Sequence, residues 1–63
     1  MLAENLHRIR TEKHISQEEL GRLTDIAQPR ISEIERGIVR NPSVRVLRAL
    51  NQKLGVTLDE LLG

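Results

Sequence analysis

The side chains of this chain that could do chemistry fall into two sets, and the first has no useful spacing. His7 and His14 lie seven residues apart with no second pair of ligands nearby, which does not suit a metal site. Ser16, Ser32 and Ser43 have no histidine and acid partners in an arrangement that would activate them. A chain of 63 residues also has little room for a catalytic cleft. We therefore expect neither enzymatic activity nor a bound metal or cofactor.

The second set lies in the stretch DIAQPRISEIERG, residues 25–37, which has the periodicity of a short helix. At about 100° per residue, Ala27, Ile31 and Ile34 fall on one side. The opposite side carries Gln28, Pro29, Ser32, Glu33 and Arg36. Glutamine can contact adenine through two hydrogen bonds, glutamate can accept from the cytosine amino group, and serine suits either donors or acceptors. This side is therefore a candidate surface for contacting base edges in a DNA major groove.

Positive charge is concentrated around this stretch, although the net charge of the whole chain is only +1. Residues 30–48 contain two glutamates and five arginines, namely Arg30, Arg36, Arg40, Arg45 and Arg48. The guanidinium fork suits phosphate oxygens, so these arginines could contact a nucleic-acid backbone. The alternative is an ordinary solvated surface. The chain has no aromatic residue, which argues against base stacking on single strands.

Size and composition favour one small helical domain, residues 1–63, with a core of leucine, isoleucine, valine and alanine. A domain of this length buries only about 60% of its unfolded surface. Without cysteine it has neither disulfides nor thiolate metal sites. No apolar run approaches the roughly 18 residues of a membrane span, and the segment MLAENLHRIR lacks the apolar stretch of a secretory signal. A cytoplasmic protein without a membrane partner is expected.

Hydrophobic periodicity and capping signals predict five helices and no strands, so the predicted fold class is all-α. The predicted helices cover about residues 2–13, 17–24, 28–36, 44–54 and 58–62. Two capping boxes, Ser16 with Glu19 and Thr57 with Glu60, mark the starts of the second and fifth helices. The apolar stripes of these helices consist of aliphatic residues: Leu2, Leu6, Ile9, Leu20, Leu23, Ile31, Ile34, Val44, Leu47, Leu50, Leu54, Leu58, Leu61 and Leu62.

The connection between the second and third helices is too short for anything but a tight turn. Such a connection sets two helices at a steep angle, as in a helix-turn-helix. Gly21 weakens the second helix by up to about 1 kcal/mol relative to alanine, which indicates that another backbone passes close by. We expect Asp25 to adopt a left-handed backbone conformation. Ala27 leaves the third helix without a side-chain cap, and Gly37 is its expected terminator.

The segment ISQEELGRLTDIAQPRISEIERG, residues 15–37, resembles the helix-turn-helix of the phage-repressor and Cro group, the XRE family. The matching pattern is SQEEL, a small residue at position 21, the turn, IS, IE and a final glycine. Two other parts of the chain also resemble the family: residues 41–62 and the first-helix residues Leu6, Ile9 and Arg10. The resemblance implies a compact five-helix lambda-repressor-like domain with its helix-turn-helix at about residues 16–36.

By this resemblance, Gln17 contacts a phosphate and supports Gln28, which is the leading base-reading side chain. Arg10 and Glu35 match a structural ion pair that bridges the first and third helices. Where the family usually has a polar residue, Pro29 offers only apolar contact, for instance with a thymine methyl group. The full set of expected DNA-binding residues is Gln17, Gln28, Pro29, Arg30, Ser32, Glu33, Arg36, Arg40 and Arg45.

The resemblance implies a sequence-specific regulator of transcription that binds double-stranded DNA, most simply a repressor. It would act as a homodimer on a palindromic operator, in the cytoplasm and at the nucleoid of a prokaryotic or phage-type system. The alternative is an antitoxin or adaptor subunit whose main partner is a protein such as a toxin. The contact surface would then comprise Leu58, Leu61 and Leu62. An adaptor alone has no need for arginines around the third helix, which favours DNA.

Overall fold

The computed structural model describes all 63 residues and contains five α-helices and no strand. They are α1 (Leu2–Glu12), α2 (Gln17–Thr24), α3 (Gln28–Glu35), α4 (Val44–Leu54) and α5 (Leu58–Leu62). The predicted all-α class is confirmed, and the predicted boundaries agree with the observed ones to within one residue. None of the helices is long and apolar enough to cross a bilayer.

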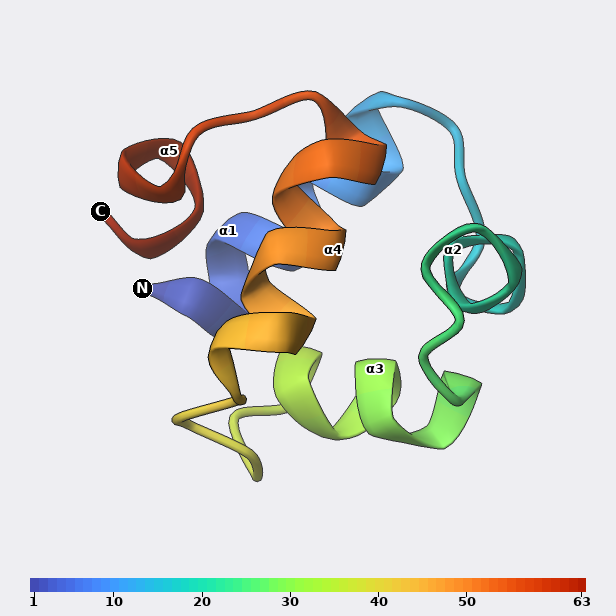
Figure 1. Cartoon of the computed structure of the whole chain (residues 1–63), viewed down its shortest axis with the longest axis horizontal. Coiled ribbons are helices and arrows are strands. Elements are labelled where there is room, and N and C mark those ends of the chain that lie inside the picture. The colour runs from blue at the N-terminus through green and yellow to red at the C-terminus, as the bar shows by residue number, and fades with distance from the viewer.

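The helices surround α4, which runs through the middle of the view in Figure 1. Helix α2 is seen nearly end-on while α3 runs across the picture, so these two helices cross at a steep angle. Helices α1 and α2 both pack against α3, and α1 and α4 both contact α5. The two termini lie together beside α5, where the Met1 amino group is 3.4 Å from the Gly63 carbonyl oxygen.

The core consists of eight buried aliphatic side chains that come from all five helices. They are Leu6, Ile9, Leu20, Ile31, Ile34, Leu50, Leu54 and Leu61. Helix α3 contributes Ile31 and Ile34, both of which are fully buried. Because both isoleucines point inward, the opposite face of α3 must point to solvent.

Gly21 of α2 packs directly against the main chain of the turn before α3 and of the first residue of α3. A Cβ atom at this position would lie 2.8 Å from the carbonyl oxygen of Ile26 and 3.5 Å from the amide nitrogen of Gln28. The predicted close backbone approach is therefore confirmed. Gly21 and Thr24 are both buried, so the inner face of α2 extends from Leu20 toward these residues. The prediction that Leu23 faces the core is wrong, because it lies beyond the edge of that face and is 43% exposed.

Four other apolar residues of the predicted helices are exposed, all of them close to a helix end. Val44 is 66% exposed because it is the first residue of α4, and Val46 packs against the core instead. Leu58 and Leu62 are 46% and 47% exposed, since the short α5 turns only Leu61 inward. Ala27, placed with the two isoleucines from the sequence, is also exposed because it precedes the first turn of α3.

The turns around the helix-turn-helix follow the predicted backbone conformations. Asp25 has φ 60° and ψ 28°, and Gly37 has φ 77°. The Ser16 side chain accepts a hydrogen bond from the Glu19 amide at 3.0 Å, but Glu19 returns none, so only half of that predicted capping box is formed. The box of Thr57 and Glu60 is complete. The Ser16 cap and the left-handed turn at Asp25 define the two ends of α2. The start of α3 has no side-chain cap, as predicted for Ala27.

Candidate nucleic-acid interface

The outward face of α3 presents the polar residues that the sequence placed there. Gln28, Pro29, Arg30 and Arg36 are exposed, whereas Ser32 and Glu33 are half-buried. Pro29 lies in the first helical turn, where the missing N–H of proline removes no intrahelical hydrogen bond. The face therefore has a donor and acceptor side chain at its start, an apolar ring beside it and a guanidinium at its end.

An ion pair between α1 and α3 lies behind this face. Arg10 donates from Nε to Glu35 Oε2 at 2.6 Å and from Nη2 to Glu35 Oε1 at 2.9 Å. Its third nitrogen, Nη1, donates to the carbonyl oxygen of Ile15 at 2.8 Å. The two charged side chains are only 10% and 4% exposed. Because buried charges are costly without a partner, the loss of either residue would leave the other uncompensated.

Both members of the pair are held in their charged forms. Burial alone would raise the pKa of the Glu35 carboxyl group, but hydrogen bonds from Arg10, Gln17 and His7 outweigh it and hold the pKa below its ordinary value. The hydrogen bond to Glu35 raises the pKa of the Arg10 guanidinium, against the opposing effect of burial. The negative charge on Glu35 is thus a fixed feature of the site at neutral pH.

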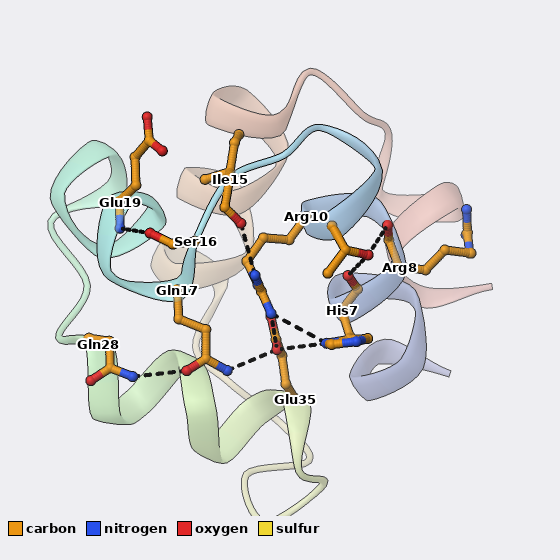
Figure 2. A network of polar contacts seen from close by, with 10 residues as sticks. His7, Arg8, Arg10, Ile15, Ser16, Gln17, Glu19, Gln28 and Glu35 are labelled. Carbon is orange, nitrogen blue, oxygen red and sulfur yellow. Dashed lines mark hydrogen bonds and ion pairs between the residues drawn. The ribbon is translucent and has the colours of Figure 1, made fainter.

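Gln17, the first residue of α2, connects this ion pair to the outward face of α3. Its Nε2 donates to Glu35 Oε1 at 3.0 Å, and its Oε1 accepts from Gln28 Nε2 at 2.8 Å. Figure 2 shows the resulting chain of hydrogen bonds, which runs from Arg10 through Glu35 and Gln17 to Gln28. Gln28 is exposed, yet its carboxamide is restrained by a neighbour that is itself restrained.

His7 also belongs to this network, although no sequence pattern predicted a partner for it. Its Nδ1 lies 3.2 Å from Glu35 Oε1 and 3.3 Å from Arg10 Nη2 (Figure 2). The imidazole is 61% exposed, so it covers the ion pair from the solvent side. The one available signal was the three-residue spacing from Arg10, which places both side chains on the same face of α1.

The arginines predicted to contact DNA lie in two groups. Arg30 and Arg45 border an open groove of about 560 Å³ between the α2–α3 turn and the start of α4. Arg36 caps the C-terminal end of α3, and Arg40 lies four residues further along the chain, in the loop that follows. Arg30 lies 3.9 Å from the Glu33 carboxylate, whereas Arg36, Arg40 and Arg45 take part in no ion pair. These three guanidinium groups have no carboxylate partner to compete with a phosphate.

Comparison with known proteins identifies the class. A family model described as helix-turn-helix matches residues 6–61. A protein of Sinorhizobium fredii named "Uncharacterized HTH-type transcriptional regulator y4dJ" is 40% identical over 62 residues, which cover 98% of this chain and 79% of that protein. The chain therefore belongs to the XRE family of helix-turn-helix proteins. It is a DNA-binding regulator of transcription and not an enzyme.

A second relative extends well beyond the matched region. A protein of Coxiella burnetii that is also named "Uncharacterized HTH-type transcriptional regulator" is 34% identical over 62 residues. The match covers 98% of this chain but only 29% of the Coxiella protein, so the chain spans less than a third of that relative. The same helix-turn-helix unit thus occurs within proteins of quite different length.

Proposed function

We propose that this protein binds specific sequences in double-stranded DNA by placing α3 in the major groove, and that it acts as a repressor. The observation that carries the proposal is the position of Gln28. It is exposed at the start of α3, and Gln17 holds its carboxamide at 2.8 Å. A restrained glutamine beside a groove can recognise adenine through two hydrogen bonds, a contact worth about 1–3 kcal/mol of discrimination.

The other residues of the site divide into base contacts and backbone contacts. Pro29, Ser32 and Glu33 share the outward face with Gln28 and would meet neighbouring bases. Glu33 is the least obvious of these, since a carboxylate near phosphates is repelled, but Arg30 lies 3.9 Å away and offsets part of that repulsion. The phosphates would be bound by Gln17 at the start of α2 and by the cationic side chains around α3, namely Arg30, Arg36, Arg40 and Arg45.

Assembly as a symmetric homodimer on a palindromic operator follows from the size of the reading helix. Helix α3 has eight residues and can cover only a few base pairs. Two-fold dimers of this architecture read half-sites about 34–36 Å apart, which doubles the number of bases read. Occupying an operator is sufficient for repression, whereas activation requires a further contact with the transcription machinery. The protein would bind its operator in the cytoplasm, at the nucleoid.

A second function, as an antitoxin or adaptor that binds a protein such as a toxin, is supported by the exposed leucines of α5. Leu58 and Leu62 lie four residues apart on one side of this helix and are 46% and 47% exposed. Leu61, assigned to the same surface from the sequence, is fully buried and cannot contribute. The two functions are compatible, because the α5 surface and the outward face of α3 use different residues.

Selection of bound duplexes from a random pool tests the primary proposal. We expect enrichment of one motif with two-fold symmetry and a half-site spacing close to one helical turn. Gln28→Ala should still bind DNA but should enrich a motif that has lost its preference at one base pair in each half-site. Lys13→Ala, at the exposed end of α1, serves as the control. Absence of any enriched motif with the unmodified protein would refute sequence-specific reading.

A further inference from the structure

The hydrogen-bond chain from Glu35 to Gln28 has a direction. An ionised carboxylate only accepts hydrogen bonds, so every neighbour that contacts it must donate. Gln17 therefore turns its Nε2 toward Glu35, at 3.0 Å. The other end of the Gln17 carboxamide, Oε1, is then the end that faces Gln28. Because Oε1 only accepts, Gln28 must in turn meet it with Nε2, which it does at 2.8 Å.

We propose that Glu35 is a specificity-determining residue that acts through Gln17: its negative charge fixes the orientation of the Gln28 carboxamide and thereby selects adenine over guanine. This inference rests on the proposed function, since it requires that Gln28 reads a base. It adds a role for Glu35, which is 4% exposed and so lies behind the reading face as a positioning residue.

The physical basis is the difference between the two purines in the major groove. Adenine presents an acceptor at N7 and a donor at N6, whereas guanine presents acceptors at both N7 and O6. With Nε2 turned toward Gln17, Gln28 has its Oε1 and one remaining N–H free for a base. The oxygen matches the adenine N6 amino group and is repelled by guanine O6.

Without this restraint the selection would be lost. The terminal torsion of glutamine is broad and roughly two-fold, so a free side chain on the surface rotates between two orientations. The rotated orientation directs both N–H groups away from Gln17, toward the two guanine acceptors. Within this hydrogen-bond network, only Glu35 and Gln17 distinguish the two orientations, because the Gln28 side chain has no other hydrogen-bond partner in the structure.

Position 17 offers a matched pair of substitutions that separates the two orientations. Gln17→Lys places a group that only donates between Glu35 and Gln28, so Gln28 must turn its Oε1 inward and its NH2 outward. Gln17→Glu gives up the hydrogen bond to Glu35, since two carboxylates can only accept, but it still offers Gln28 an acceptor, so Gln28 keeps its present orientation. Each protein is titrated with two operator duplexes that differ only in A·T or G·C at the base pair read by Gln28. The ratio of the two Kd values within one protein cancels the effect of the added charge.

We expect the unmodified protein to prefer the adenine duplex by about 5- to 150-fold. Gln17→Glu should keep this preference, and Gln17→Lys should abolish it or reverse it in favour of guanine. Glu35→Gln, which replaces the acceptor by a group that can accept or donate, should reduce the ratio toward 1. If Glu35→Gln does not fold, as shown by circular dichroism, the half-buried position 17 still decides the question. An unchanged ratio in folded Gln17→Lys would overturn the inference.

The failure of this inference can be told apart from failure of the proposed function. If Gln28→Ala keeps the same ratio as the unmodified protein, Gln28 does not read this base pair and the function assigned to it is wrong. If Gln28→Ala removes the preference while Gln17→Lys preserves it, Gln28 reads the base but Glu35 does not set its orientation.

Discussion

Replacing Ile34 by alanine tests which side of α3 points inward, on which the whole assignment of the reading face depends. Ile34 is fully buried in the core. Truncation of such a side chain costs about 2–5 kcal/mol, since apolar contacts are lost and a cavity remains. A domain of this length has a free energy of unfolding of roughly 3–9 kcal/mol in total. We therefore expect Ile34→Ala to lose much of that stability and to be partly unfolded at 37 °C.

The measurement is urea denaturation followed by circular dichroism, with the midpoint and the slope recorded separately. The matched control is Ile38→Ala, the same substitution at a position that is 58% exposed, which should change stability by no more than about 0.5 kcal/mol. An unchanged slope with a lower midpoint identifies a pure loss of stability. If Ile34→Ala were as stable as Ile38→Ala, the buried and outward faces of α3 would be assigned the wrong way round. The assignment of the reading face would then be wrong as well.

Further perturbations address the site and the ion pair. Gln28→Ala should weaken binding to the selected operator by about 1–3 kcal/mol and leave binding to random duplex unchanged. Arg40→Ala should weaken both alike and reduce the log–log salt slope by about one per protomer, as measured by titration at several salt concentrations. Arg10→Met should lower the free energy of unfolding by about 3–5 kcal/mol, as measured by urea denaturation, and adding Glu35→Leu should recover much of that loss. Folding lowers the pKa of Glu35, so its contribution to stability is complete at neutral pH and is lost as the pH falls below about 4. The melting temperature of Glu35→Gln should therefore fall less in acid than that of the unmodified protein. Gel-shift stoichiometry should give two protomers per operator; one protomer per minimal site at all concentrations would contradict the dimer.

The elements that were predictable from the sequence depend on local signals. Ile31 and Ile34 lie three residues apart between polar neighbours, which is enough to define the two faces of α3. Asp25, with its short polar side chain, and Gly37, which has no Cβ atom, both tolerate the left-handed backbone required at those turns. Such signals need no knowledge of the rest of the chain.

The sequence-based predictions of burial were wrong where burial depends on which other helix packs against a residue. Leu23 has the spacing of a core residue, but Gly21 allows α3 so close to α2 that the inner face is displaced away from it. The contacts of Glu35 with His7 and Gln17 join residues that are 28 and 18 positions apart. Nothing in the local sequence specifies such pairs, because they exist only once three helices have docked.

The contact at Gly21 makes the joint between α2 and α3 a contact of main chain with main chain. A Cβ atom there would meet the Ile26 carbonyl oxygen at 2.8 Å, so the spacing of the two helices is set by atoms that every amino acid shares. Substitutions on the outward face of α3 leave this joint untouched. New base-contacting residues can therefore be placed on α3 without changing how α3 packs against α2. This makes the domain suitable for engineering DNA-binding specificity. Position 21 is the exception, where even alanine would change the angle at which every outward side chain is presented.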